Sequence, residues 1–153
     1  MFGACMISRG WHLVSVTDAK GYSSALTALN AEQLQLCSRA DLLPIFENKM
    51  PCQAKQATPQ QLSDRSKISK AEKPVFMKWL VLTEENNKKL AATHEQYNRQ
   101  AGDGVASLAK NKDEAGAKLG EQLYDGRISW GEYNKGRMEI VLRAEDAAKN
   151  LVH

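Results

Sequence analysis

Apolar side chains recur at steps of three and four residues through the second half of the chain, which is the spacing of amphipathic helices. The longest such stretch covers about residues 70–100. A capping box, Ser69-Lys70-Ala71-Glu72, precedes it, and in such a box the hydroxyl and the carboxylate each accept a hydrogen bond from a backbone N–H. Pro74 falls in the second turn and predicts a kink or a weakened start. Most of the apolar face consists of Phe76, Trp79, Leu80, Thr83, Leu90, His94 and Tyr97.

Two further helices follow this stretch. Residues 105–124 resume the helical spacing after the break at Gly102-Asp103-Gly104. A second box, Ser129-Trp130-Gly131-Glu132, opens a last helix that runs to about Asn150. A helix of about 30 residues would be ~45 Å long, which exceeds the width of a compact domain. We therefore predict that the helix at 70–100 projects from the domain or is covered by another long helix.

The first half of the chain carries shorter patterns. Residues 1–30 show no clear period and are predicted to form an irregular N-terminal arm, with a short strand or extended segment at 11–16. Short helices are expected at about 30–37 and 42–48. Thr58-Pro59 predicts an N-cap followed by proline at the first helical position.

Composition agrees with a single globular domain. The chain has 153 residues, of which 42% are hydrophobic and 25% are charged, close to the average for such domains. Lys and Arg total 21 against 18 acidic residues, so the formal net charge is +3. This balance does not favour nucleic acid as the partner. No run approaches the ~18 consecutive apolar residues that a membrane span needs.

The three cysteines divide into a pair and a single residue. Cys37 and Cys52 flank a short apolar module that has no C-x-x-C spacing and no histidine, which argues against zinc and against a thioredoxin-like site. A disulfide between them would stabilise the fold by ~3 kcal/mol in the chain-entropy model, provided that the compartment is oxidising. The alternative is two buried reduced thiols, because free cysteine packs well. We favour the disulfide.

The remaining cysteine, Cys5, follows Phe2-Gly3-Ala4, and this tetrapeptide resembles the end of a bacterial lipobox. Only four residues precede Cys5 in the sequence, whereas an apolar signal core needs roughly 7–15. Two interpretations stay open. Either the sequence is truncated and Cys5 is a lipid anchor that associates the protein with a membrane, or residues 1–5 are the ordinary start of a cytoplasmic protein.

These patterns predict a mainly α fold, a long-helix bundle or hairpin with an N-terminal half of short helices stapled by one disulfide. The whole chain, residues 1–153, forms a single domain. Its parts are the irregular arm at 1–30, the short disulfide-linked helices at 31–68 and the long helices at 69–153.

The sequence contains no motif that predicts catalysis, a cofactor or a metal site. H-E-x-x-H, G-x-S-x-G, the P-loop and G-x-G-x-x-G are absent. His12, His94 and His153 share no metal-ligand spacing with cysteine or acidic residues. His94 lies on the apolar side of the predicted long helix and is expected to be a hydrogen-bonded core or boundary residue rather than a ligand. We expect no enzymatic activity, no cofactor and no small-molecule substrate.

Two groups of residues are candidates for an interaction patch. The basic segment could contact anionic headgroups at ~1 kcal/mol per cation, but four charges without interleaved aromatics are a weak signal for nucleic acid. Alternatively, the basic segment is simply the solvent-exposed start of a helix and binds nothing. The aromatic pair suits a binding hot spot or, alternatively, packing at a helix–turn–helix corner. The basic segment consists of Arg65, Lys67, Lys70 and Lys73, and the aromatic pair of Trp130 and Tyr133.

Two segments carry a resemblance to known proteins. The first contains Leu36-Cys37-Ser38-Arg39, Pro44-Ile45-Phe46, Pro51-Cys52 and Ile68-Ser69-Lys70-Ala71-Glu72-Lys73. The second is Leu123-Tyr124-Asp125-Gly126-Arg127-Ile128-Ser129-Trp130-Gly131-Glu132-Tyr133-Asn134. Together they resemble a group of small, mainly helical, exported or lipid-anchored proteobacterial proteins without an assigned activity. The similarity covers about residues 35–140 and implies export and a helical fold, but no catalytic residue.

These observations favour a non-enzymatic protein of the bacterial envelope, either periplasmic or membrane-anchored. It would act as an interaction or structural module that binds a protein partner through a helical face. The alternative is a cytoplasmic adaptor or regulator with reduced cysteines, which contacts nucleic acid or a protein through residues 65–73.

Overall fold

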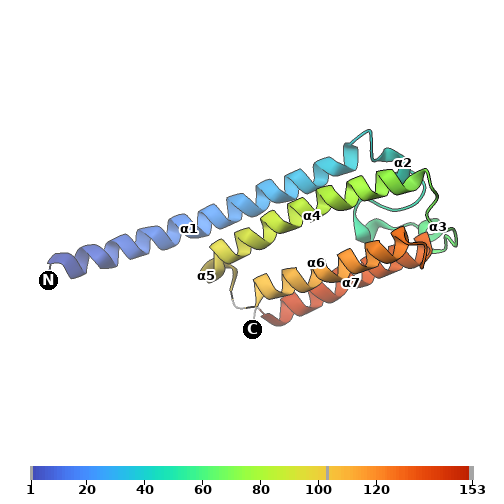
Figure 1. The fold of residues 1–153 in the computed structure, drawn as a ribbon. Helices are drawn as coiled ribbons and strands as arrows, with labels where there is room; N and C mark the ends of the chain where they lie inside the picture. The colour runs from blue at the N-terminus through green and yellow to red at the C-terminus, as the bar shows by residue number, and fades with distance from the viewer. Residues whose placement is uncertain (1, 103, 152–153) are drawn as a thin grey trace.

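The long helices pack as two antiparallel pairs, α1 with α4 and α6 with α7 (Figure 1). The computed structural model describes residues 2–102 and 104–151, with side chains from residue 19 onward. Over these residues it contains helices and no strand, which confirms the mainly α prediction. In chain order the elements are α1 (Phe2–Gln35), η1 (Leu36–Ser38), α2 (Leu43–Phe46), η2 (Ala54–Gln56), α3 (Pro59–Leu62), α4 (Glu72–Gln96), α5 (Asn98–Ala101), α6 (Val105–Tyr124) and α7 (Trp130–Leu151).

The helix α1 corrects the prediction for residues 1–30, because residues 2–30 form a regular helix rather than an irregular arm with a strand or extended segment at 11–16. The separate short helix expected at 30–37 is the end of α1 followed by η1. Its 34 residues give a length of about 50 Å, and its N-terminal part extends beyond the end of α4 (Figure 1). The turn-like composition of residues 17–21 does not interrupt it. Local propensity is a weak signal, and packing against another helix overrides it.

Contacts along the C-terminal half of α1 show this packing against α4. Asn86 Nδ2 donates a hydrogen bond to Gln33 Oε1 (2.9 Å). A Cβ at Gly21 would lie 3.0 Å from the Tyr97 hydroxyl oxygen, so glycine allows the tyrosine to approach α1 closely. Helix α1 therefore covers α4, which agrees with the prediction that a helix as long as α4 projects from the domain or is covered by another long helix.

The helix α4 begins at Glu72 and ends at Gln96, slightly shorter than the predicted 70–100. Both hydrogen bonds of its capping box are present: the Glu72 N–H donates to Ser69 Oγ (3.1 Å), and the Ser69 N–H donates to Glu72 Oε1 (2.8 Å). Pro74 is the third residue of the helix, where the missing N–H has no intrahelical acceptor. Proline therefore fits this first turn without interrupting the helix, which corrects its predicted place in the second turn.

The buried core lies at the end of the molecule where α2 and α3 meet α4, α6 and α7 (Figure 1). The Phe76 ring centroid lies 5.6 Å from that of Trp130 and 5.2 Å from that of Tyr133, both edge to face. We call this part the disulfide end, and the opposite part, around α5 and the start of α6, the open end. The buried hydrophobic residues are Leu36, Leu42, Ile45, Met50, Ile68, Phe76, Trp79, Leu123, Trp130 and Tyr133.

Candidate functional site

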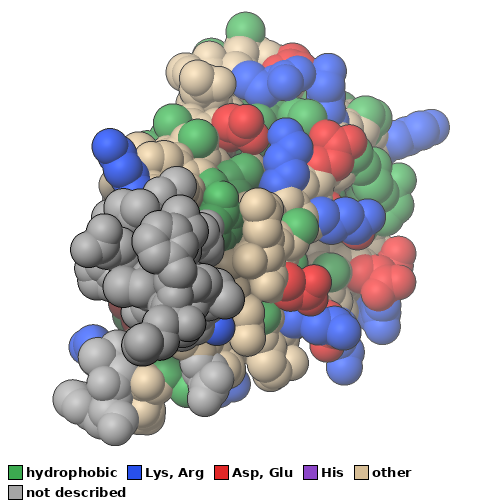
Figure 2. Space-filling view, turned by 90° about the vertical axis from the view of Figure 1, so that its left-hand side faces the viewer, with side chains coloured by type: hydrophobic (Ala, Val, Ile, Leu, Met, Phe, Trp, Pro, Cys, Tyr) green, Lys and Arg blue, Asp and Glu red, His purple; other side chains and the backbone are tan. Residues whose placement is uncertain are grey.

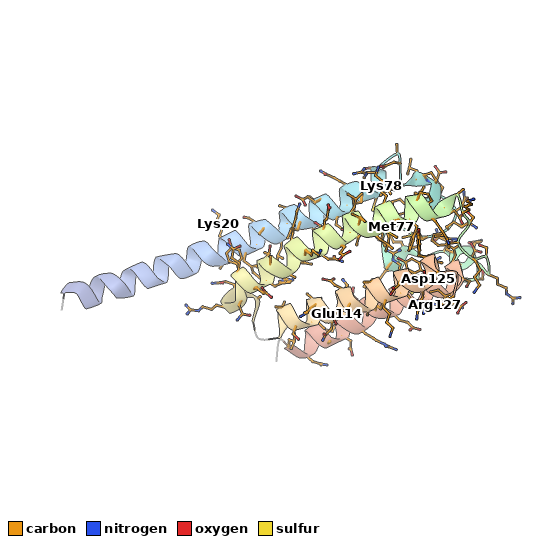
Figure 3. The ribbon with its side chains drawn as sticks, in the orientation of Figure 1. Lys20, Met77, Lys78, Glu114, Asp125 and Arg127 are labelled. Carbon is orange, nitrogen blue, oxygen red and sulfur yellow. A yellow bond between two sulfur atoms is a disulfide. The ribbon has the colours of Figure 1, made fainter. Side chains whose placement is uncertain are left out.

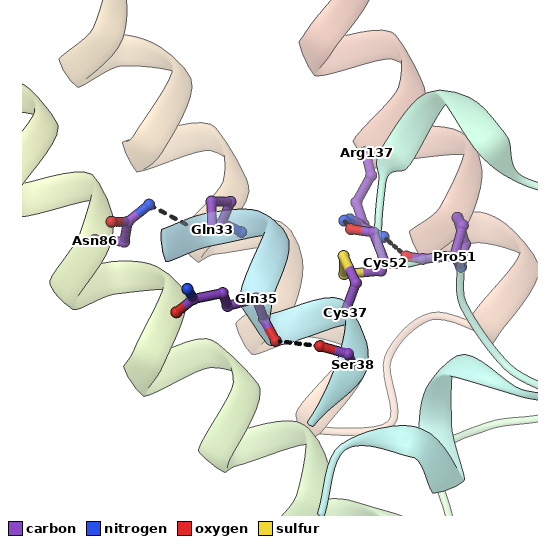
Figure 4. The surroundings of a disulfide bond; sticks show 8 residues. All are labelled: Gln33, Gln35, Cys37, Ser38, Pro51, Cys52, Asn86 and Arg137. Carbon is purple, nitrogen blue, oxygen red and sulfur yellow. Dashed lines mark hydrogen bonds between the residues drawn. A yellow bond between two sulfur atoms is a disulfide. The ribbon is translucent and has the colours of Figure 1, made fainter. Parts of the chain in front are cut away.

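Cys37 and Cys52 are bonded to each other, which confirms the predicted disulfide. Beside the bond, Arg137 donates from Nη1 to the Pro51 carbonyl oxygen (2.6 Å) and from Nη2 to that of Cys52 (3.0 Å) (Figure 4). The same guanidinium lies 4.8 Å from the Trp79 ring centroid, a cation–π contact. Burial lowers the pKa of Arg137. Arg137 thus ties α7 to the disulfide loop, a role that the helical spacing alone could not reveal.

Trp130 and Tyr133 are core residues, 0% and 2% exposed, so they do not form an interaction patch. The alternative, packing at the corner before the last helix, is correct. Trp130 Nε1 donates to Glu72 Oε1 (3.3 Å), which links the start of α7 to the capping box of α4. The second predicted box is also present, because the Glu132 N–H donates to Ser129 Oγ (3.1 Å).

The first turn of α7 is docked on the loop after α3. The Trp130 N–H donates to the Ser66 carbonyl oxygen (2.9 Å), and the Gly131 N–H donates to that of Asp64 (2.8 Å). A Cβ at Gly131 would lie 2.6 Å from the Leu62 carbonyl oxygen and 2.7 Å from that of Asp64. Only glycine fits this close approach of helix and loop. Gly131 lies inside the predicted capping box, but the S-x-x-E pattern carries no information about this contact.

Asn134 is a second structural residue that the sequence analysis missed. Its side chain is 0% exposed, and its Nδ2 donates to the carbonyl oxygens of Lys49 (2.8 Å) and Gln61 (2.9 Å). The amide therefore joins α7 to the turn after α2 and to α3. A polar residue beside Tyr133 on the apolar side of the predicted helix was the available signal.

The basic segment is partly occupied by contacts within the chain. Lys67 Nζ donates to the Arg127 carbonyl oxygen (3.2 Å), and Lys73 Nζ lies 5.1 Å from the Tyr124 ring centroid. Arg65 and Lys70 are exposed. Because two of its four cations are held by the protein itself, the segment is not a fully available cationic surface. Contact with nucleic acid or a membrane through it stays a prediction, for which the salt dependence of binding is the test.

A hollow of about 180 Å³ lies between α4, α6 and α7, toward the open end. We call it the α4–α6 hollow. The α6 residues that line it are three or four positions apart, so they form one face of that helix. Its apolar lining consists of Leu90, Val105, Leu108, Ala109 and Ala144, and its polar lining of Asn87, His94, Lys112 and Asp113.

The register of α4 and α6 places these polar residues along the hollow. The two antiparallel helices meet closely where Leu80 faces Gly120, since a Cβ on the glycine would lie 2.8 Å from Leu80 Cδ2. Counting from this contact at about 1.5 Å per residue puts Asn87 level with Asp113, and His94 about 10 Å farther along. Polar groups therefore lie at both ends of the hollow, with apolar side chains between them.

His94 is buried, 8% exposed, and shares a hydrogen bond with the Tyr22 hydroxyl at 2.8 Å from Nδ1. This contact confirms the predicted hydrogen-bonded boundary histidine and ties α4 to α1. Burial lowers the pKa of His94, which keeps the imidazole neutral at neutral pH.

Asp113 is a half-buried carboxyl group at the edge of the α4–α6 hollow. Among the described residues, none forms a hydrogen bond or an ion pair with it; Lys112 acts on it only at longer range. Burial raises the pKa of Asp113 to about 6, against the opposing effect of Lys112. A carboxylate in this setting gains most from a cation that enters the hollow.

Three further predictions concern metal, membrane and lipid. Among the side chains that the structure describes, from residue 19 onward, no group of three or more His, Cys, Asp and Glu residues could hold a metal ion. No helix within residues 2–102 and 104–151 has the length and apolar character needed to cross a membrane. The Cys5 side chain lies outside the described side chains, so its lipid attachment stays a prediction.

Comparison of the chain with protein-family models, curated proteins and solved structures gave no match. The resemblance to small proteobacterial envelope proteins therefore stays an expectation. Assignment of a function depends on the residues and their geometry.

Proposed function

We propose that this protein is a non-enzymatic protein of the bacterial envelope that binds a partner protein through the helical faces around the α4–α6 hollow. One observation carries this proposal. The helices that enclose a buried core at the disulfide end leave a hollow of about 180 Å³ between them toward the open end. An apolar groove between helices is a common receptor for the apolar face of a partner segment.

The disulfide supports the envelope location. Such bonds persist in the periplasm and other oxidising compartments and are rare in the reducing cytosol. The Cys37–Cys52 bond closes a loop with a sequence separation of 15, which corresponds to ~3 kcal/mol of stabilisation in the chain-entropy model. A contribution of this size would be lost in the cytosol, which argues against the cytoplasmic alternative.

The surface charge supports a protein as the partner. Figure 2 shows Lys and Arg side chains intermixed with Asp and Glu on the face seen from the N-terminal end of α1. A mixed surface is less suited to a polyanion than a continuous basic one. Leu142 and Leu151 of α7 are 47% and 42% exposed and add apolar area on the helix that also contributes Ala144 to the hollow.

Site-specific photocrosslinking in the producing cells tests the binding surface. A photoreactive residue would replace Leu90 or Leu108, which line the hollow, and in the control would replace Glu47, an exposed residue of the disulfide end. We expect one discrete crosslinked partner from both hollow positions and none from the control. Equal crosslinking at all three positions, or none from the hollow, would contradict the proposal.

The redox state of the cysteines in the same cells tests the location. Free thiols are alkylated at lysis, and the protein is then weighed with and without reduction. We expect Cys37 and Cys52 to be protected from alkylation until reductant is added. Two free thiols in protein from its native compartment would overturn the envelope assignment.

A further inference from the structure

We propose that the α4–α6 hollow receives a primary ammonium group on a short aliphatic stem, supplied by a lysine side chain of the partner. The inference rests on the proposed function and specifies the chemistry of the contact. It follows from the unpaired carboxyl group, the apolar walls and the arrangement of the other charges around the hollow.

Asp113 supplies the negative charge. Its carboxyl group lines the hollow and has no hydrogen bond or ion pair with any other residue that the structure describes. A half-buried carboxylate without a partner is unfavourable, and an ammonium group that replaces its lost hydration relieves this cost. Asn87, level with Asp113 on α4, lies at the same end of the hollow and offers an amide oxygen as a second acceptor.

The apolar walls fit an aliphatic stem of four methylene groups. Leu90, Leu108, Ala109 and Ala144 lie along the hollow between its polar ends. Lysine commonly lays its stem along apolar surface while its charged group reaches a polar partner. The volume of about 180 Å³ is also adequate, because a cavity of roughly 150 Å³ accepts benzene, a molecule of similar bulk.

The charge distribution favours a small cation over a larger one. A single carboxylate and one amide offer few acceptors, which suits the three donors of an ammonium group better than the five of a guanidinium. On α4, His94 is the titratable group of the lining, and burial favours its neutral form; on α7, the lining residue Ala144 carries no charge. Lys112, on the same face of α6, is the other charged lining residue and opposes a cation that enters the hollow.

Binding of small probes to the full chain tests the ammonium site. The probes are n-butylammonium, which is the lysine side chain itself, and 1-butanol as its neutral counterpart, titrated at pH 7.5 with backbone amide NMR shifts as the readout. We expect n-butylammonium to shift the amides of residues 105–113 and 87–94, and 1-butanol to bind at least about 10-fold more weakly, since a charged hydrogen bond is lost.

Three variants separate Asp113 from general charge effects. Asp113→Asn is expected to weaken n-butylammonium binding by about 10-fold or more. Glu114→Gln makes the same charge change at the next position of α6 (labelled in Figure 3), and should leave binding unchanged because this residue is exposed and does not line the hollow. Lys112→Gln should strengthen binding. Equal binding of both probes, or equal losses in Asp113→Asn and Glu114→Gln, would overturn the proposal.

Two further measurements identify the source of the ammonium group. A capped tripeptide, acetyl-Ala-Lys-Ala-amide, should shift the same amides as n-butylammonium. If only the free amine binds, the assignment to a lysine of a partner is wrong. The crosslinking experiment repeated with Asp113→Asn should give a weaker partner band. An undiminished band would overturn the ammonium contact while leaving the proposed partner-binding function intact.

Discussion

The disulfide end and the open end are built from the same helices but are held together in different ways. At the disulfide end, aromatic rings of α4 and α7 pack against each other in the buried core. Gly131, Asn134 and Arg137 of α7 also donate hydrogen bonds to backbone carbonyl groups of residues 49–64, far away in sequence. Toward the open end, α4 contacts α1 through the His94–Tyr22 hydrogen bond and leaves a hollow on its other side. The buried core therefore lies at the disulfide end, and the proposed partner site lies toward the open end.

The largest difference is expected for truncations in the two regions. Trp130→Ala removes a fully buried indole and should lower the free energy of unfolding by about 3–5 kcal/mol. Leu108 lines the hollow, so fewer neighbouring atoms pack against it, and Leu108→Ala should lower the free energy of unfolding by less than about 2 kcal/mol. Urea denaturation of both variants makes the comparison. Equal losses would mean that the two ends are equally packed.

Removal of the disulfide is the next largest change. The double variant Cys37→Ser/Cys52→Ser should lose about 3 kcal/mol of stability, because the unfolded chain regains the entropy of the open loop. A loss below about 1 kcal/mol in the double variant would show that the hydrogen bonds of Arg137 hold the loop without the covalent bond.

A pair of glycines compares the two regions by the same substitution. Gly131→Ala places a Cβ against backbone atoms that cannot move aside, and should cost about 1–3 kcal/mol. Gly116→Ala, in the middle of α6, meets no atom within 4 Å and should stabilise the protein by about 0.5–1 kcal/mol. Thermal unfolding monitored by circular dichroism gives both values. The same sign for both variants would contradict this difference in packing.

The smallest effect is expected from the pH dependence at the hollow. Folding raises the pKa of Asp113 from 3.8 to about 6, so its protonated form stabilises the protein below pH ~4, and this contribution is lost as the pH rises to about 6. Asp113→Asn should therefore stabilise the protein by about 1 kcal/mol at pH 7.5, a value reduced for the partial exposure of the carboxyl group. The gain should disappear at pH 4.

Urea unfolding of both proteins from pH 4 to pH 8 measures this effect. Folding also lowers the pKa of His94, so acidification protonates this imidazole in the unfolded state first. The folded protein therefore loses stability from this group as the pH falls. The difference between the two proteins cancels this opposing trend. A stability difference that does not vary with pH would show that ionisation of Asp113 does not destabilise the folded protein.

Local signals in the sequence predicted the long helices and their beginnings well. Both S-x-x-E boxes and the Thr58 cap lie where their residues place them, because capping depends on side chains within three positions of each other. The cysteine pair was also predictable, since its spacing and surroundings excluded the common metal and redox motifs. The helix over residues 2–30 was not predictable, because α1 pairs with a helix more than 50 residues away in sequence.

The candidate site was not predictable in the same way. Asp113 belongs to no sequence motif, and its significance arises only when α4 and α7 border the same space as α6. Trp130 and Tyr133 illustrate the reverse error, since aromatic side chains suit both hot spots and cores. Their burial depends on Phe76, which lies on a different helix, and helical spacing carries no information about such pairings.

The tie between Arg137 and the Cys52 carbonyl group has a consequence for the order of events during synthesis. The two residues are 85 positions apart, so about 4–17 s separate their emergence at 5–20 residues per second. During that interval the disulfide loop is complete but lacks the helix that later covers it. We therefore expect the cysteines to be accessible to an oxidation catalyst before Arg137 of α7 bonds to the loop.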